Sequence, residues 1–127
     1  MRAVTCYTSL RRREDFSRVH RQGRRKGDAL LQVRVLPHPS EPSGQCPIRL
    51  GMIVSKKYGS AVARNRFKRL VRAALRVLAP ELTPGWDVLV LPREAHEVSM
   101  WEVLASFRQL LGALGLLQTP ESSIGSS

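Results

Sequence analysis

The clearest pattern of apolar and polar positions runs from Ala61 to Leu78. On a helix of about 100° per residue, one arc is apolar and comprises Ala63, Phe67, Leu70, Val71, Ala74, Val77 and Leu78. The opposite arc carries Arg64, Asn65, Lys68, Arg69, Arg72 and Arg76, with Arg66 at the boundary. Ser60 is the expected N-cap, because its hydroxyl can accept a hydrogen bond from the first turn. The pattern therefore predicts an amphipathic helix over residues 61–78.

Three segments show the patterns of β-strands. Apolar and polar positions alternate over residues 30–36 and 48–54, as in strands with one buried face. Residues 87–91 are apolar on both faces and favour an interior strand. The proline-rich segment 37–47 is predicted to form a hairpin-like loop. The second strand, the helix over 61–78 and the third strand form a β-α-β unit, for which the general rule predicts a right-handed crossover.

Two further helices are expected, one near each end of the chain. Residues 11–22 predict a short helix that ends at Gly23 as a C′ residue. Ser99 and Glu102 form an S-x-x-E capping box that opens a last helix. Its predicted core stripe is Trp101, Leu104, Phe107, Leu110, Leu111 and Leu114. The pattern as a whole predicts an α+β sandwich with one sheet.

Charge is distributed unevenly along the 127 residues, whose formal net charge is +11. Residues 11–26 contain eight basic and two acidic side chains, and residues 49–76 contain nine basic and no acidic ones. Residues 77–127 contain two basic and six acidic side chains. Because 43% of the residues are apolar, we expect one folded cationic domain over 1–117 and a disordered tail over 118–127. We also expect the two basic segments to share a surface.

The basic positions of the 61–78 helix repeat with one sign. Arg64, Lys68, Arg72 and Arg76 follow one another at i,i+4 spacing. Such a row can be a solvated face, but like charges at this spacing repel one another and destabilise the helix. A polyanionic partner that neutralises the row is therefore the favoured interpretation.

The helix over 11–22 places an aromatic residue among arginines. Phe16 can be a core anchor, or it can be a platform on which an unpaired base stacks, as in proteins that bind single-stranded nucleic acid. His20 lies one turn further on and is expected to be a surface residue.

Sequence motifs of catalysis and metal binding are absent. Cys6 and Cys46 have no paired spacing, the three histidines are scattered, and no Walker loop or G-x-S-x-G segment occurs. Any reacting groups are therefore expected to come from another molecule. The N-terminus lacks the apolar stretch of a signal peptide, and the longest apolar run is too short to span a bilayer, so the cytoplasm is the expected location.

Several stretches together resemble the bacterial ribonuclease P protein family over about residues 9–114. The segment SKKYGSAVARNRFKRLVR, with Arg64-Asn65-Arg66 at its centre, is similar to that family's signature. Further matches are LRRREDFSRVHRQG with Asp15-Phe16 and Gly23, Arg49-Leu50-Gly51 before Val54-Ser55-Lys56-Lys57, and Asp87-Val88-Leu89-Val90 followed by Arg93.

The resemblance implies the order α-β-β-β-α-β-α, a two-layer sandwich like the second domain of the small-subunit ribosomal protein S5. A short strand near Arg24 to Gly27 is then expected, and the crossover through the basic helix is left-handed, against the general rule. The implied activity is removal of the 5′ leader of precursor tRNA, with the RNA subunit and bound Mg²⁺ performing the chemistry. The implied partners are ribonuclease P RNA and precursor tRNA, without DNA or membrane.

The resemblance also implies two binding regions and no catalytic or metal-ligating residue in this chain. The RNA subunit is expected to contact Lys56, Lys57, Arg64, Asn65, Arg66, Lys68, Arg69 and Arg72. The single-stranded leader is expected in a cleft between the first helix and the sheet, formed by Phe16, His20, Gln32 and Arg34. Relatives commonly have an aromatic residue at the position of His20 and often one at Arg34. Both side chains can still stack on bases, so leader contacts are expected to be more electrostatic here.

Two other functions are compatible with a cationic fold. A structural RNA-binding protein, such as a ribosomal protein, shares the charge but does not require a cleft at Phe16. A DNA-binding module fits poorly, because recognition helices read base edges with mixed side chains, whereas this face is nearly all Arg and Lys.

Overall fold

The structure is a computed structural model that describes residues 7–37, 48–82, 85–93 and 99–117. The order of its elements is β1 (Tyr7–Ser9), α1 (Arg13–Gln22), β2 (Arg24–Gly27), β3 (Leu31–Pro37), β4 (Ile48–Met52), η1 (Lys56–Tyr58), α2 (Ala61–Leu78), η2 (Ala79–Glu81), β5 (Trp86–Pro92) and α3 (Met100–Ala113). The expected α+β sandwich is confirmed. The disordered tail and most of the proline-rich loop were predicted for residues outside the described ranges.

One five-stranded sheet has the order β1-β4-β5-β3-β2. β4 pairs with β1 and β5 in parallel, whereas β3 pairs with β5 and β2 antiparallel. The interior strand predicted over 87–91 is confirmed, because β5 lies at the centre of the sheet. The hairpin-like connection predicted between the strands over 30–36 and 48–54 is wrong, because β5 inserts between β3 and β4. The doubly apolar β5 is the strand best suited to that buried place.

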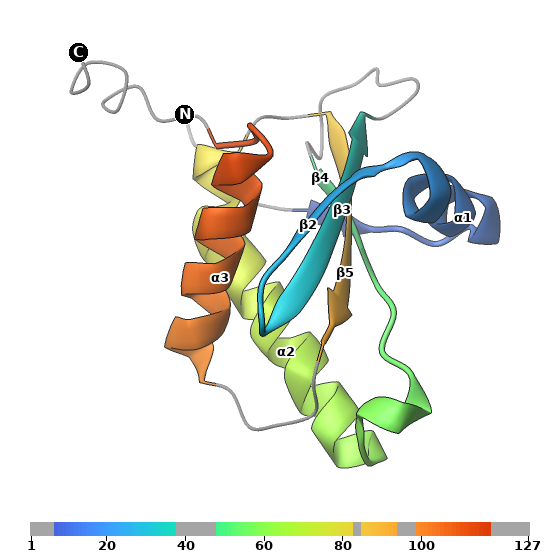
Figure 1. Cartoon of the computed structure of the whole chain (residues 1–127), viewed down its shortest axis with the longest axis vertical. Coiled ribbons are helices and arrows are strands. Elements are labelled where there is room, and N and C mark those ends of the chain that lie inside the picture. The colour runs from blue at the N-terminus through green and yellow to red at the C-terminus, as the bar shows by residue number, and fades with distance from the viewer. Residues whose placement is uncertain (1–6, 38–47, 83–84, 94–98, 118–127) are drawn as a thin grey trace.

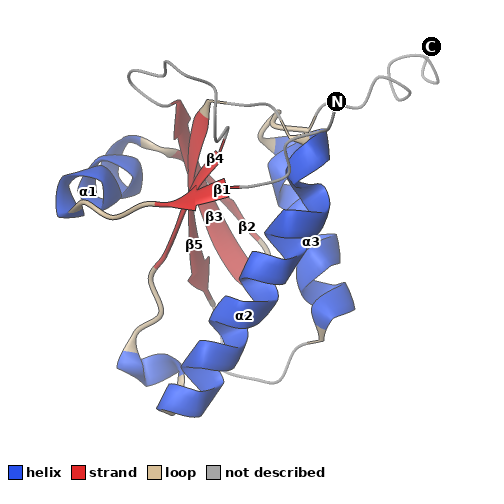
Figure 2. Cartoon of the chain, turned by 180° about the vertical axis from the view of Figure 1, so that it is seen from behind, coloured by secondary structure: helices blue, strands red, loops and turns tan. Residues whose placement is uncertain are grey.

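The two faces of the sheet differ in polarity. Helices α2 and α3 cover one face, and α1 lies on the other (Figures 1 and 2). The main core lies under α2 and α3 and includes the fully buried Val33, Ile48, Val88, Phe67 and Phe107. A smaller cluster under α1 comprises Leu10, Val19 and Leu89, with Phe16, Leu36 and Leu91 packed against it. The alternation of apolar and polar positions along β3 thus assigns each strand face to a different helix layer.

The β4-α2-β5 crossover is left-handed, as the resemblance implied and against the general rule. Viewed from the side of α2 and α3 with the parallel strands pointing upward, β5 lies to the left of β4 (Figure 1). A right-handed crossover would set the apolar stripe of α2 against the face that carries Arg49 and Asp87. The left-handed path instead places α2 on the face of Ile48, Leu50 and Val88.

The helix ends are formed as their capping residues predict. Helix α2 has the predicted bounds, and the N–H of Ala63 donates to the Ser60 hydroxyl at 3.1 Å. At α3, the Glu102 N–H donates to the Ser99 hydroxyl at 3.2 Å, and the Ser99 N–H donates to the Glu102 carboxylate at 2.8 Å. Both caps satisfy backbone donors that the helix itself leaves without partners. The local sequence therefore sets where these two helices begin.

Gly23 ends α1 for a different reason from the one expected. Its φ is −71° and its ψ is 150°, so it is an extended C-cap residue and not a left-handed C′ residue. A Cβ at this position would lie 2.5 Å from the carbonyl oxygen of Val19 and 3.0 Å from that of Val35. Glycine is required because the chain turns into β2 in close contact with neighbouring backbone.

Two predicted core positions are exposed. Val77 is 50% exposed, whereas Leu75, which the predicted stripe omits, is fully buried. Helix α3 lies beside α2 (Figure 1), and only one flank of the apolar stripe is covered. Trp101 is 75% exposed because it lies about 120° around α3 from the buried Phe107, and Val103 takes its place in the core.

The N-terminal part of the chain differs from the prediction in two places and agrees with it in a third. Helix α1 begins at Arg13 rather than at residue 11, with Arg12 as its N-cap. The short strand β1, for which residues 1–9 gave no signal, pairs in parallel with β4. The extra strand near Arg24 to Gly27 is confirmed as β2.

Candidate RNA-binding surfaces

The outer face of α2 is cationic over its whole length. Of the residues predicted to contact RNA, Asn65, Arg66, Arg69 and Arg72 are exposed, and Arg64 and Lys68 are half-buried. Arg64 is held near the helix start, where its Nε donates to the Gly59 carbonyl oxygen at 3.3 Å. Among the described residues, no carboxylate forms an ion pair with any basic side chain of α2. This face is therefore available to a polyanion.

The C-terminal half of this face contains a shallow depression of about 450 Å³. Its lining residues are Arg66, Arg69, Leu70, Arg72, Ala73 and Arg76. Four arginines and two apolar residues, Leu70 and Ala73, thus line the same depression. Guanidinium groups can bond phosphate oxygens in a bidentate manner, and an apolar surface suits a sugar or a base.

Phe16 is half-buried on the second face, in the cluster under α1. A Cβ at Gly51 would lie 2.8 Å from Cε1 of Phe16 and 3.2 Å from Cβ of Leu10. The bare glycine of β4 therefore makes room for the phenylalanine ring. The two interpretations of Phe16 are compatible, because the ring packs on the sheet and keeps part of its surface accessible.

Four charged residues join α1 to the sheet beside this ring. Asp87 is fully buried and accepts hydrogen bonds from Arg49 Nε at 2.8 Å, Arg49 Nη2 at 2.9 Å and Arg18 Nη2 at 2.9 Å. Asp15 lies 3.4 Å from both Arg18 and Arg49. The hydrogen bonds to Asp87 are the main cause that raises the pKa of Arg49 above its ordinary value. We call this set the Asp87 network.

The other residues predicted for the leader cleft lie on the same face. Arg34 donates from Nε and Nη2 to the Gln32 side-chain oxygen at 3.1 and 3.0 Å, and from Nη1 to the carbonyl oxygen of His20. The imidazole of His20 is exposed. The structure thus brings Arg34, Gln32 and the C-terminal turn of α1 together, and it leaves the His20 ring at the surface.

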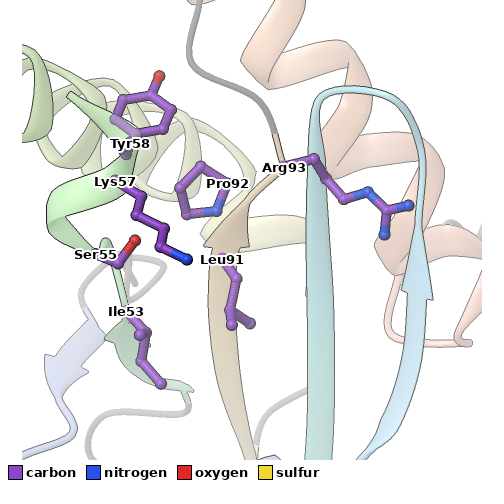
Figure 3. A pocket seen from close by; sticks show the side chains of 7 residues that line it. All are labelled: Ile53, Ser55, Lys57, Tyr58, Leu91, Pro92 and Arg93. Atoms are coloured by element: carbon purple, nitrogen blue, oxygen red, sulfur yellow. The ribbon is translucent and has the colours of Figure 1, made fainter.

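A pocket of about 300 Å³ opens where β4 and β5 end (Figure 3). Its lining residues are Ile53, Ser55, Lys57, Tyr58, Leu91, Pro92 and Arg93. Leu91 also packs in the cluster with Phe16, so the pocket adjoins the α1 face of the sheet. Lys57 and Arg93 contribute charge from separate segments, and burial is the main cause that raises the pKa of Tyr58.

The two basic segments do not form one surface, contrary to the expectation from charge. Helix α1 and helix α2 lie on opposite faces of the sheet (Figures 1 and 2). The 3-10 helix η1 precedes α2 in the chain. Its Lys57 lines the same pocket as Leu91. The segment Lys56–Tyr58 therefore extends the cationic region of α2 to the pocket at the ends of β4 and β5.

Comparison with known proteins decides the family. The family model described as Ribonuclease P matches residues 6–115. The ribonuclease P protein component of Roseiflexus sp. (strain RS-1) is 35% identical over 115 residues, covering 89% of this chain and 90% of the relative. The chain belongs to the ribonuclease P protein family. It is thus a protein component of the ribonucleoprotein endoribonuclease that acts in tRNA 5′ processing.

Solved structures of ribonuclease P proteins share the fold. A Staphylococcus aureus ribonuclease P protein mutant with defective mRNA degradation activity has a TM-score of 0.74 at 24% identity, covering 86% of this chain and 89% of that chain. The Thermotoga maritima protein in complex with 1-(4-fluorophenyl)-2-thiourea has a TM-score of 0.69 at 28% identity, covering 79% and 94%.

The structure also shows contacts on these surfaces that the sequence alone did not predict. Arg49, Asp87 and Asp15 were noted as parts of the resemblance, but nothing in their spacing indicated one network. The motif at the end of β5 gave no role to Arg93, which lines the same pocket as Lys57 because β4 pairs with β5, although its side chain points away from Lys57 toward β2 (Figure 3). Contact between such distant segments leaves no local signal in a single sequence.

The donor chemistry of the described residues is limited. Within them, no group of three or more His, Cys, Asp or Glu side chains could hold a metal ion. None of the described helices combines the length and the apolar character that crossing a membrane requires. Cys6, Cys46 and two of the three histidines lie outside the described ranges.

Proposed function

We propose that this ribonuclease P protein holds two RNA segments on opposite sides of its sheet. The cationic face of α2, with Lys56 and Lys57, contacts the RNA subunit. The face under α1 contacts the single-stranded 5′ leader of precursor tRNA. The observation that carries the proposal is the series of basic side chains on α2 for which the described residues provide no acidic partner.

Contact with the RNA subunit is supported by the charge and shape of α2. The exposed guanidinium groups of Arg66, Arg69 and Arg72 reach a depression that also offers apolar surface. Binding of such a face releases counterions from the RNA, which makes assembly strongly dependent on salt. Arg64 stabilises the connection from η1 into α2 through Gly59, so it shapes this surface as well as carrying charge.

Contact with the leader is supported by the mixture of ring, amide and cation on the opposite face. Phe16 supplies an aromatic surface, and Gln32, Arg34 and the exposed His20 lie around the C-terminal half of α1. Leu91 continues the apolar surface to the pocket with Lys57 and Arg93. Stacked bases and a cationic track are how single-stranded nucleic acid is commonly bound.

Cleavage itself is assigned to the RNA subunit. The described donor set does not fit a magnesium site built by this chain, because no cluster of three or more candidate ligands occurs in it. In this proposal Mg²⁺ is bound by the RNA subunit and the substrate, and the protein positions the two RNA segments. The protein alone is expected to have no nuclease activity.

The test compares Arg72→Ala with Phe16→Ala in the reconstituted holoenzyme. Arg72→Ala should weaken assembly with the RNA subunit and lower the salt slope of assembly by about 0.9, because one phosphate contact is lost. Phe16→Ala should leave assembly intact and weaken binding of leader-bearing precursor by about 1–3 kcal/mol, with little change for mature tRNA. Titrations across a potassium chloride series measure both quantities.

Controls separate local from global effects. Arg108→Ala on α3 also removes an exposed cation and should leave assembly unchanged, because Arg108 lies on another helix and pairs with Glu81 at 2.8 Å. Phe16→Leu keeps apolar packing and should retain the fold while reducing leader binding. If Phe16→Ala weakens precursor and mature tRNA equally, the leader assignment is wrong, whereas the assignment of α2 is unaffected.

A further inference from the structure

The β2–β3 hairpin places two arginines directly opposite each other. In the antiparallel register, Arg25 pairs with Arg34. Residues that are directly opposite project from the same face, with Cβ atoms about 4.5–5.5 Å apart, and like charges in such a pair are destabilising. A cross-strand pair of this kind therefore indicates a need for an anion between its members.

Arg34 is held in place by neutral groups only. Its hydrogen bonds go to the Gln32 side chain and to the carbonyl oxygen of His20, so none of them supplies negative charge. Three of the five N–H groups of a guanidinium are used in this way, which leaves two donors for a ligand. Burial, and then the nearby Arg25, lower the pKa of Arg34 from its ordinary value.

Arg25 is exposed and forms no ion pair with any described residue. The acid nearest in the hairpin sequence is Asp28, whose carboxylate is already engaged. One oxygen accepts from the N–H groups of Leu30 and Leu31 at 2.8 and 3.0 Å, and the other accepts from the Ser106 hydroxyl at 2.7 Å. Asp28 is thus directed toward the hairpin turn and α3.

The arginine pair continues a row that begins under Phe16. Across the sheet, Gly51 pairs with Leu89, Leu89 with Arg34, and Arg34 with Arg25. Phe16 lies against Gly51 at one end of this row. With strands about 4.8 Å apart, the row extends roughly 14 Å from the ring contact to the edge strand. Leu89, in the middle of this row, is fully buried under α1 with Val19, so a strand of RNA that stacks at Phe16 has to pass around the helix to reach both arginines.

We infer that Arg25 and Arg34 together bind one phosphate of the single-stranded leader at the edge of the sheet. The inference rests on the proposed leader face and adds Arg25 to it. Arg34 is preorganised by Gln32 and His20, and the exposed Arg25 completes a two-sided clamp when the anion enters. A phosphate between the two guanidinium groups removes their mutual repulsion and accepts hydrogen bonds from both.

The matched variants are Arg25→Ala and Arg24→Ala. Arg24 is the preceding residue of the same edge strand and is equally exposed, but its side chain projects from the other face, since Arg24 pairs with Val35 of the main core. In the holoenzyme, Arg25→Ala should lower the salt slope for leader-bearing precursor by about 0.7 and leave mature tRNA unchanged. Arg24→Ala should change neither ligand.

A second measurement replaces leader phosphates one at a time by neutral methylphosphonates. With the unmodified protein, one linkage should weaken binding, and with Arg25→Ala that same linkage should have little further effect. Arg25→Ala should also retain or raise the melting temperature, because a repulsive pair is removed, so a loss of binding cannot be ascribed to unfolding.

The outcomes distinguish this inference from the proposed function. The clamp is overturned if Arg25→Ala and Arg24→Ala change the binding of leader-bearing precursor equally. It is also overturned if every neutral linkage weakens binding to Arg25→Ala as much as it weakens binding to the unmodified protein. If Phe16→Ala weakens leader binding while Arg25→Ala does not, the leader face stands and the clamp fails. If Phe16→Ala and Arg25→Ala each change the binding of precursor and of mature tRNA by the same amount, the assignment of the leader to this face is wrong.

Discussion

The cations of α2 and those beside α1 come from segments that are similarly basic in sequence, yet the folded protein treats them differently. On α2, Arg66, Arg69 and Arg72 are exposed and lack acidic partners among the described residues. Beside α1, Arg18 and Arg49 are bound to the buried Asp87. Free cations supply salt-dependent affinity, whereas paired cations fix the position of an element.

This difference changes how the net charge of the chain is understood. Of the eight basic side chains of residues 11–26, only Arg18 forms an ion pair within the described residues, and the second paired cation, Arg49, comes from the segment that contains α2. The α1 face thus combines exposed cations with a ring and an amide, around a helix that the Asp87 network fixes to the sheet. We infer that α2 contributes strength of binding and that the α1 face contributes discrimination between RNA segments.

The largest expected effect on stability is that of Asp87→Ala, which removes the central carboxylate of the Asp87 network. Removal of the buried carboxylate leaves Arg49 and Arg18 without their main partner, and the loss of one member of a buried pair costs about 3 kcal/mol of unfolding free energy. Urea unfolding measures the change. Glu81→Ala, which breaks the exposed pair with Arg108, should cost less than about 1 kcal/mol. Similar losses for both variants would contradict the structural role of the Asp87 network.

Gly51→Ala sharpens the comparison at Phe16. The added methyl would lie 2.8 Å from the ring, so the ring must move, and overpacking of this kind costs about 1–3 kcal/mol. We expect reduced leader binding with unchanged assembly on the α2 face. In the background of Phe16→Leu, the same substitution should cost less stability, which a double-mutant cycle measures. An unchanged cost would show that Phe16 is not the contact.

Anion binding by the free protein tests the α2 region when the unmodified protein is compared with a variant of α2. Sulfate should raise the melting temperature more than chloride at matched ionic strength, because it neutralises the row of like charges on α2. The double variant Arg72→Ala/Arg76→Ala should lose part of this difference, equivalent to about 0.5 kcal/mol. Sulfate also stabilises folded proteins in general, and this action is the same for the unmodified protein and the variant. The difference between the two proteins therefore measures the specific effect. An identical sulfate response in both proteins would argue against an anion site there.

The smallest effect concerns the response to acid of the β2–β3 turn, where Asp28 bonds Ser106 of α3. Burial alone would raise the pKa of Asp28, but hydrogen bonds from Ser106, Leu31 and Leu30 outweigh it and lower the pKa below the usual 3.8. A lowered folded pKa stabilises the protein above the unfolded value, and this contribution is lost as the pH falls below about 3.8. Asp28→Asn should therefore flatten the stability profile below about pH 4, as measured by thermal unfolding, with no change in slope above pH 6.

Local patterns were enough to predict several elements. Helix α2 has the predicted bounds because its apolar stripe repeats over five turns and Ser60 caps its first turn. The capping box of α3 and the interior position of β5 were likewise evident, since each depends on neighbours in the chain. The cationic outer face of α2 follows directly from the same periodicity. The roles of individual site residues in RNA binding remain predictions.

What the sequence by itself determined is thus the three helices, the three longer strands, their polarity and, through the resemblance, the strand β2 and the family, but not the strand β1. The tertiary structure decided which residues from distant segments meet. Asp87 binds arginines from α1 and β4, Gly51 receives the ring of Phe16, and Arg25 stands opposite Arg34. It also decided that β5 separates β3 from β4 and that the basic segments lie on opposite faces. The physical reason is that these contacts depend on strand order and crossover hand, which are fixed by burial of the whole apolar face rather than by local pattern.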